Sequence, residues 1–165
     1  MLHPHEFTVG PISEVGNLTL VLPRNGYEHA YLVAPSGEGL HAVYLSGDHV
    51  YSSFDCQGNT ALEGLLIPDV AIEVDPDSLF DPNDGRSPLG AIIRTGQILG
   101  VASINVDPRS FQRRLTVPLQ TALPSLPPQM SAGFHSWAIT LGRGLERREL
   151  FKVDVGRRAE SVTTS

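Results

Sequence analysis

Short runs of alternating apolar and polar residues fill most of this chain, and Gly and Pro residues separate them. Alternation with a period of two is typical of β-strands that bury one face. The sixteen Gly and thirteen Pro residues leave little room for long helices. About eight such strands predict an all-β fold, or a β-rich fold with one or two short helices, arranged as an antiparallel sandwich or barrel.

The first half of the chain predicts a four-stranded meander. Asn25-Gly26 favours a type I′ hairpin turn, Gly47-Asp48 favours a type II′ turn, and residues 35–39 join the two hairpins. The pairs expected from these turns are Leu20 with Tyr31, Val33 with His41, and His41 with Phe54. Because side chains alternate along a strand, one face then holds Leu18, Leu20, Leu22, His29, Tyr31, Val33, His41, Val43, Leu45, Val50 and Phe54.

Three later regions add more strands. Leu65–Val74 is apolar and interrupted by Pro68, which predicts a strand at a sheet edge or with a bulge. Gly90–Val106 reads as two strands around a turn at Thr95-Gly96. Trp137–Leu141 and Leu150–Val155 alternate and form a last antiparallel pair, joined by a polar, Arg-rich connection.

Helix signals are weak and local. Asp107-Pro108 is a suitable N-terminal cap for a short helix over Arg109–Leu115, and Asp75-Pro76 begins a single turn. We expect one domain over residues 1–155 and a polar, disordered tail over residues 156–165.

The composition sets limits on class and compartment. A chain of 165 residues buries about 70% of its unfolded surface, so we expect folding without a metal or a disulfide. The lone Cys56 has no internal disulfide partner, which indicates a reducing compartment. The N-terminus lacks a signal-peptide pattern, and no apolar run reaches the ~18 residues of a membrane span. These observations predict a cytoplasmic protein with no membrane partner.

Charge is spread unevenly along the chain. Residues 1–85 carry thirteen acids and one base, whereas residues 86–165 carry five acids and eleven bases. The net charge of −6 therefore combines a half near −12 with a half near +6. Two explanations fit: acidic and basic surfaces meet between subunits of a homo-oligomer, or the two halves pair inside one chain.

No catalytic or metal-binding constellation emerges from the motifs. His29 and His41 lie about 13 Å apart along the predicted sheet, which is too far for one metal ion. The acidic loop 75–85 fails the register of an EF-hand. The chain also lacks a nucleophile elbow, a P-loop and a dinucleotide fingerprint. We therefore predict no metal, no cofactor and no catalytic residues.

Paired arginines are the clearest candidate interaction residues. Arg113, Arg114, Arg147 and Arg148 have aromatic residues nearby in sequence and predict an interaction surface. The overall negative charge argues against nucleic acid, because acids repel phosphates.

The leading hypothesis is a non-catalytic β domain for binding or assembly, with a protein partner or a second copy of itself. The alternative is a small-ligand-binding β-barrel or an enzyme, with a cavity lined by His29, Tyr31 and His41. An enclosed pocket with converging polar groups distinguishes the second from the first.

Overall fold

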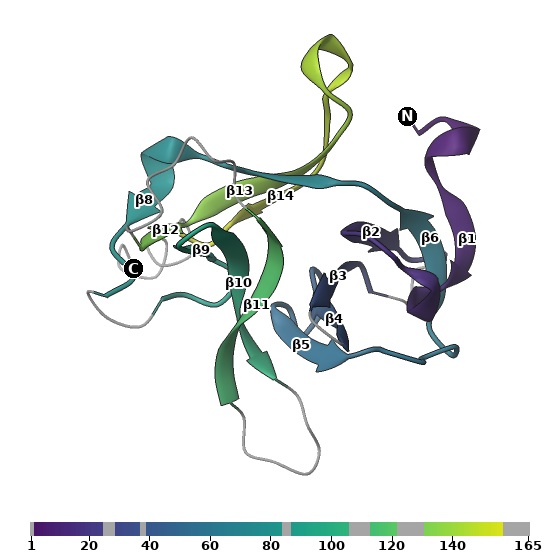
Figure 1. The fold of residues 1–165 in the computed structure, drawn as a ribbon, viewed down its shortest axis with the longest axis horizontal. Coiled ribbons are helices and arrows are strands. Elements are labelled where there is room, and N and C mark those ends of the chain that lie inside the picture. The colour runs from purple at the N-terminus through teal and green to yellow at the C-terminus, as the bar shows by residue number, and fades with distance from the viewer. Residues whose placement is uncertain are drawn as a thin grey trace. The chain divides into compact units, whose positions relative to one another are not determined.

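The computed structural model describes residues 2–24, 29–36, 39–83, 87–105, 113–121 and 131–156, and it confirms the all-β class (Figure 1). The strands are β1 (Thr8–Pro11), β2 (Thr19–Leu22), β3 (Tyr31–Ser36), β4 (Gly39–Tyr44), β5 (Ser52–Asp55), β6 (Glu63–Ile67), β7 (Ala71–Val74), β8 (Leu79–Phe80), β9 (Ile92–Thr95), β10 (Ile98–Asn105), β11 (Arg113–Thr121), β12 (Ala132–Phe134), β13 (Ser136–Leu141) and β14 (Arg148–Asp154). Short 3-10 turns connect them: η1 (Pro4–Glu6), η2 (Ile12–Glu14), η3 (Pro76–Ser78) and η4 (Gly144–Glu146).

Residues 1–70 and 104–113 form one compact unit. Its strands follow the order β1-β6-β2-β3-β4-β5 with antiparallel pairing throughout, and the last two residues of β10 lie parallel to β5. Strands β2 to β5 are the predicted four-stranded meander, which is therefore confirmed.

The register of the meander differs by one residue from the predicted one at every pairing. Leu20 pairs with Leu32, Val33 pairs with Ala42, and Ala42 pairs with Phe54. A one-residue shift turns every side chain of a strand to the other face. The predicted faces of β2 and β4 are therefore wrong, whereas the two successive shifts return β5 to the face of β3.

The connection between β4 and β5 accounts for part of this shift. It is not the expected two-residue turn at Gly47-Asp48, because the Tyr51 N–H donates to the Tyr44 carbonyl at 2.7 Å and residues 45–50 form the loop. Tyr51 has a φ of 67°, in the left-handed region. The other expected turn, Asn25-Gly26, lies outside the described residues.

Both faces of the meander are apolar, and this explains why the pattern did not fix the register. Leu20, Leu32 and Val43 are fully buried on one face, and Tyr31 and Val33 are buried on the other. A one-residue slip exchanges the two faces of a strand, so the pattern of apolar residues identifies the register only when the two faces differ in polarity. The core cluster on the second face consists of Ile12, Val21, Tyr31, Val33, Leu40, Ala42, Cys56 and Leu66.

Residues 71–103 and 114–165 form the second compact unit. In it, β9 and β10 make the predicted hairpin around Gly96, with Thr95 opposite Ile98. A separate three-stranded sheet has the order β14-β13-β7, and β13 pairs with β14 as predicted. The buried Trp137 ring donates its Nε1–H to the Gly90 carbonyl at 2.7 Å.

Two further expectations need correction. The helix over Arg109–Leu115 is wrong where the structure describes it, because residues 113–121 form strand β11. Val117 and Leu119 are buried and alternate with exposed neighbours, which is a strand pattern. The Leu65–Val74 region is not one strand but two, β6 and β7, which belong to different sheets. The turn after Asp75 is confirmed, since the Asp75 side chain accepts the Asp77 N–H.

The strand order of the larger sheet is an open path from β1 to β8, so the pairings among the described residues close no barrel. Within that part of the chain, no helix is long and apolar enough to cross a lipid bilayer. The single domain over residues 1–155 and the tail over residues 156–165 stay a prediction, and residues 157–165 lie outside the described residues.

Candidate functional site

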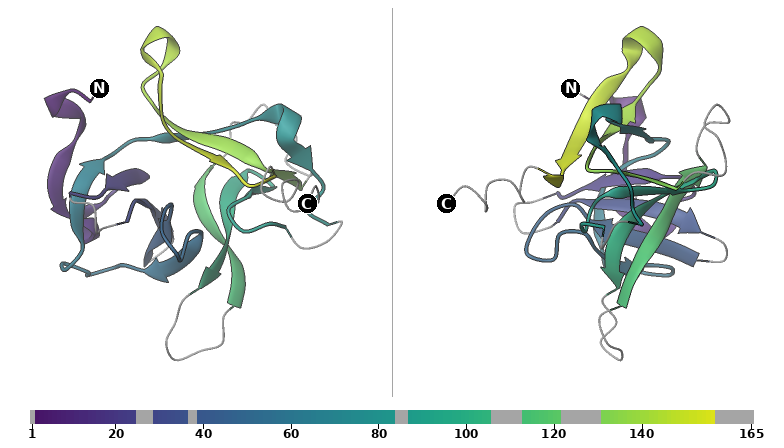
Figure 2. Two further views of the ribbon diagram at one scale, coloured as in Figure 1. Left: turned by 180° about the vertical axis from the view of Figure 1, so that it is seen from behind. Right: turned by 90° about the vertical axis from the view of Figure 1, so that its left-hand side faces the viewer.

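The end of the β13–β14 hairpin is a tightly wound loop. The two strands lie side by side in all three views, and the loop curls at their far end (Figures 1 and 2). Gly142 and Gly144 have φ values of 84° and 58°, which L side chains rarely adopt. The Glu146 N–H donates to the Arg143 carbonyl and the Arg147 N–H donates to the Gly144 carbonyl, each at 3.2 Å. These bonds close the loop on itself as a single 3-10 turn.

This loop presents an apolar side chain to solvent. Leu145 has an exposed fraction of 107%, against 60% for Leu79, and is the most exposed large apolar side chain among the described residues. Burying a leucine completely stabilises by about 1.5–3 kcal/mol. Leu145 does not gain this stabilisation in the isolated chain. We call residues 143–146 the hairpin tip.

An ion pair inside the second unit secures the base of the loop. Arg147 donates two hydrogen bonds to the Glu73 carboxylate on β7, and the one from Nε to Oε1 is 2.5 Å long. These hydrogen bonds raise the pKa of Arg147 above its usual value. A base of the second half of the chain therefore neutralises an acid of the first half, as the intramolecular explanation of the charge pattern expects.

The four predicted interaction arginines do not form one surface. Arg147 and Arg148 lie at the end of the β13–β14 hairpin, whereas Arg113 and Arg114 begin β11 in another sheet. Arg148 is half-buried and the Arg113 side chain lies outside the described part. Arg114 is exposed, donates to the Ser87 carbonyl and lines a cavity. Their role as an interaction surface stays a prediction.

The fold also redistributes the charge. The first unit holds nine acids and three bases, and the second unit holds nine acids and nine bases. The reason is that the acidic stretch 71–85 folds with the basic half of the chain. The −12 and +6 halves of the sequence thus become units with net charges of −6 and zero.

The structure does not bring His29, Tyr31 and His41 to one cavity wall. The His29 and Tyr31 rings both contact Tyr44, at centroid distances of 5.6 Å and 5.1 Å. His41 pairs with Ala34 and so projects from the other face of the meander. Ligand binding by these residues stays a prediction. Within the described ranges, no three His, Cys, Asp or Glu residues are close enough to hold a metal.

Cys56 belongs to the core of the first unit. Its Sγ donates to the Leu40 carbonyl at 3.4 Å. Burial first, and then the neighbouring Asp55 charge, raise the pKa of Cys56 from 9.0 to about 11. The side chain is therefore a protonated thiol at neutral pH, and a protonated thiol is a poor nucleophile and a poor metal ligand.

We predict that Cys56 makes stability depend on alkaline pH. Because its folded pKa lies above the unfolded value of 9.0, the contribution is complete below pH 9 and declines as pH rises towards about 11. Urea unfolding of the wild type and of Cys56→Ala between pH 8 and 11 measures it. The wild type should lose more stability over this range than the variant, and parallel curves would contradict the prediction.

Comparison with known proteins places the chain in a family. A family described as "Uncharacterised protein y4lG" matches residues 9–161. The uncharacterized protein y4lG of Sinorhizobium fredii (strain NBRC 101917 / NGR234) is 34% identical over 152 residues, which cover 92% of each chain. The chain belongs to the y4lG family. No solved structure matches it significantly.

The match to the y4lG family includes the hairpin tip, Glu73 and the Arg114 cavity. Sequence reasoning missed two of these residues, Leu145 and Glu73. Leu145 is the one apolar residue in the polar connection 142–149, which was a usable signal. Glu73 gave none, because its pairing partner Arg147 is 74 residues away in the sequence.

Proposed function

We propose that this y4lG-family chain is a non-catalytic binding module that docks on a partner protein through the hairpin tip. The observation that carries the proposal is the complete exposure of Leu145 on a loop held by glycine geometry and backbone hydrogen bonds. A loop whose backbone is already ordered by hydrogen bonds loses less entropy when a partner covers it. The tip therefore has the properties of an interface anchor.

The charges around the tip favour protein over nucleic acid. Arg143 and Glu146 are both exposed and have opposite signs, and Glu73 neutralises Arg147. A phosphate backbone needs an excess of cations, because its affinity comes mainly from charge neutralisation. Mixed charges around an apolar anchor instead match the polar rim and apolar centre of a protein interface.

The chemistry of the remaining candidates supports a non-catalytic role. The pKa of Cys56, raised to about 11, keeps this thiol protonated at neutral pH. The register that turns His41 away from Tyr31 gives no support to a catalytic His/Tyr cavity. A reduced, buried cysteine also fits the cytoplasmic location that we propose.

Photo-crosslinking in cells tests this proposal. Leu145 is replaced by the photoreactive residue p-benzoylphenylalanine, and Leu79, which is 60% exposed on β8, is replaced in a matched control. We expect a discrete protein adduct at position 145 and none at position 79. An adduct of twice the 17.8 kDa chain mass indicates a second copy, and any other mass indicates a different protein. The absence of an adduct at position 145 would contradict the proposal.

A further inference from the structure

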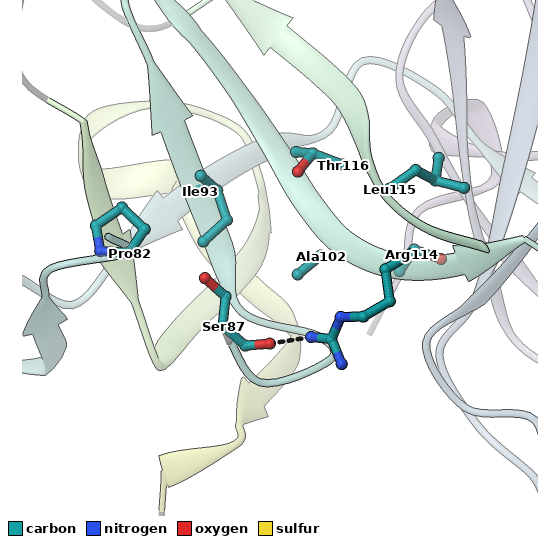
Figure 3. Close-up of a pocket in the computed structure, with 8 residues that line it drawn as sticks. Pro82, Ser87, Ile93, Ala102, Arg114, Leu115 and Thr116 are labelled. Atoms are coloured by element: carbon teal, nitrogen blue, oxygen red, sulfur yellow. Dashed lines mark hydrogen bonds between the residues drawn. The ribbon is translucent and has the colours of Figure 1, made fainter. Parts of the chain in front are cut away.

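A cavity of about 290 Å³ opens in the second unit beside β9, β10 and β11 (Figure 3). Residues from all three strands and from the loop before β9 line it. The apolar ones are Pro82, Ile93, Ala102 and Leu115, and the polar ones are Ser87, Ser103, Arg114 and Thr116. The Leu115 side chain points away from the Arg114 guanidinium (Figure 3). Figure 3 shows Arg114 on the same side of β11 as this cavity, next to Ser87. The cavity thus combines apolar residues and three hydroxyl-bearing residues with one guanidinium group.

Arg114 is placed to receive an anion. Its guanidinium donates one hydrogen bond to the Ser87 carbonyl, which orients the group, and a guanidinium has five N–H donors in all. Within the part of the chain that the structure describes, no carboxylate lies within ion-pair distance of Arg114. The cavity therefore suits a carboxylate on the guanidinium, with a small apolar group beside it against Ile93 and Ala102.

The hairpin tip of the same chain carries this combination. Leu145 is fully exposed, and the next residue, Glu146, is exposed as well. We propose that the tip of one copy occupies the Arg114 cavity of a second copy, with Leu145 against Ile93 and Ala102 and the Glu146 carboxylate on the Arg114 guanidinium. This inference rests on the proposed docking role of the tip and names its partner.

The chemistry of the contact predicts how the assembly behaves. Tip and cavity are different surfaces of one chain, so the contact either is reciprocal in a dimer or repeats in a ring or filament. An interface built around one hairpin tip is small, and small interfaces give weak association that depends on concentration. The ion pair adds salt dependence, because ions screen charges at the rim of an interface.

A charge swap between two variants tests the inference. Glu146→Arg and Arg114→Glu are purified separately and followed by sedimentation velocity over rising concentration, beside the wild type. We expect each variant alone to associate about tenfold more weakly or worse, because its tip and cavity then carry like charges. In an equimolar mixture, each tip meets a cavity of opposite charge. The mixture should therefore associate within about threefold of the wild type.

Two controls separate the contact from general charge effects. Glu149→Arg makes the same charge change at an exposed site on β14 and should leave association unchanged. Leu145→Asp should abolish association, alone and in mixtures, while the melting temperature stays within a few degrees. A wild type that remains monomeric at every concentration, or a mixture no better than its components, would overturn the inference. A crosslink from position 145 to a different protein would then leave the proposed function standing.

Discussion

Trp137→Ala is expected to lower the free energy of unfolding by about 3–5 kcal/mol, as large-to-small changes of buried aromatic residues do. Trp137 is 1% exposed and lies on β13, the central strand of the three-stranded sheet of the second unit. Its removal leaves a cavity, and it also leaves the Gly90 carbonyl without the indole N–H that donates to it. Urea denaturation followed by circular dichroism measures the loss.

Trp137→Phe separates the two causes. The phenyl ring fills part of the cavity but offers no N–H donor to Gly90. We expect an intermediate loss of about 1–3 kcal/mol, the range for leaving a buried acceptor unsatisfied. A loss below about 1 kcal/mol for Trp137→Ala would show that Trp137 is not in the core, given the usual cost of such changes.

Local patterns in the sequence predicted the strands that have a clear turn between them. Thr95-Gly96 marks the β9–β10 hairpin, and the alternation around Trp137 marks β13. The first three residues of β11, 113–115, were misread as the end of a helix because Asp107-Pro108 resembles a helix start. The alternation of Val117 and Leu119 was the better signal. Hydrophobic periodicity indicates secondary structure more strongly than the preference of one or two residues for a helix start.

The candidate site could be predicted only in part. Arg114 and Arg147 were predicted as interaction residues because each belongs to an Arg pair in the sequence, a role that stays a prediction. The residues they contact, Ser87 and Glu73, come from distant strands and loops. Single exposed leucines are common on protein surfaces, so Leu145 carries meaning only once its loop geometry is known. Contacts between residues that are far apart in the sequence produce no local pattern in a single sequence.

The charge pattern illustrates the same difficulty. The change in charge at residue 85 of the sequence suggests a molecule with an acidic end and a basic end. In the structure, however, the second compact unit contains the acidic residues 71–85 together with most of the basic half. Its nine acids and nine bases balance. Net charge along a sequence therefore does not give the charge of a surface, and the balanced charge of the second unit removes the basis for attraction between an acidic end and a basic end.

A comparison of Leu32→Ala with Leu22→Ala tests the register of the meander. In the register expected from the turns, Leu22 faces the core and Leu32 faces away from it. In the structure, Leu32 on β3 has no exposed surface, whereas Leu22 at the end of β2 is half-buried. We expect Leu32→Ala to cost about 2–5 kcal/mol and Leu22→Ala about 1 kcal/mol, because the cost follows the buried volume that is removed.

The two variants make the same chemical change on neighbouring strands, so each is the control for the other. Urea denaturation at neutral pH gives both losses, and similar slopes against urea show that the unfolded states are comparable. A larger loss for Leu22→Ala than for Leu32→Ala would restore the register expected from the turns. It would also turn His41 towards Tyr31, because a one-residue shift moves every side chain of β4 to the other face. The stability measurement therefore decides between the two arrangements of the meander and, with them, whether a cavity lined by His29, Tyr31 and His41 exists.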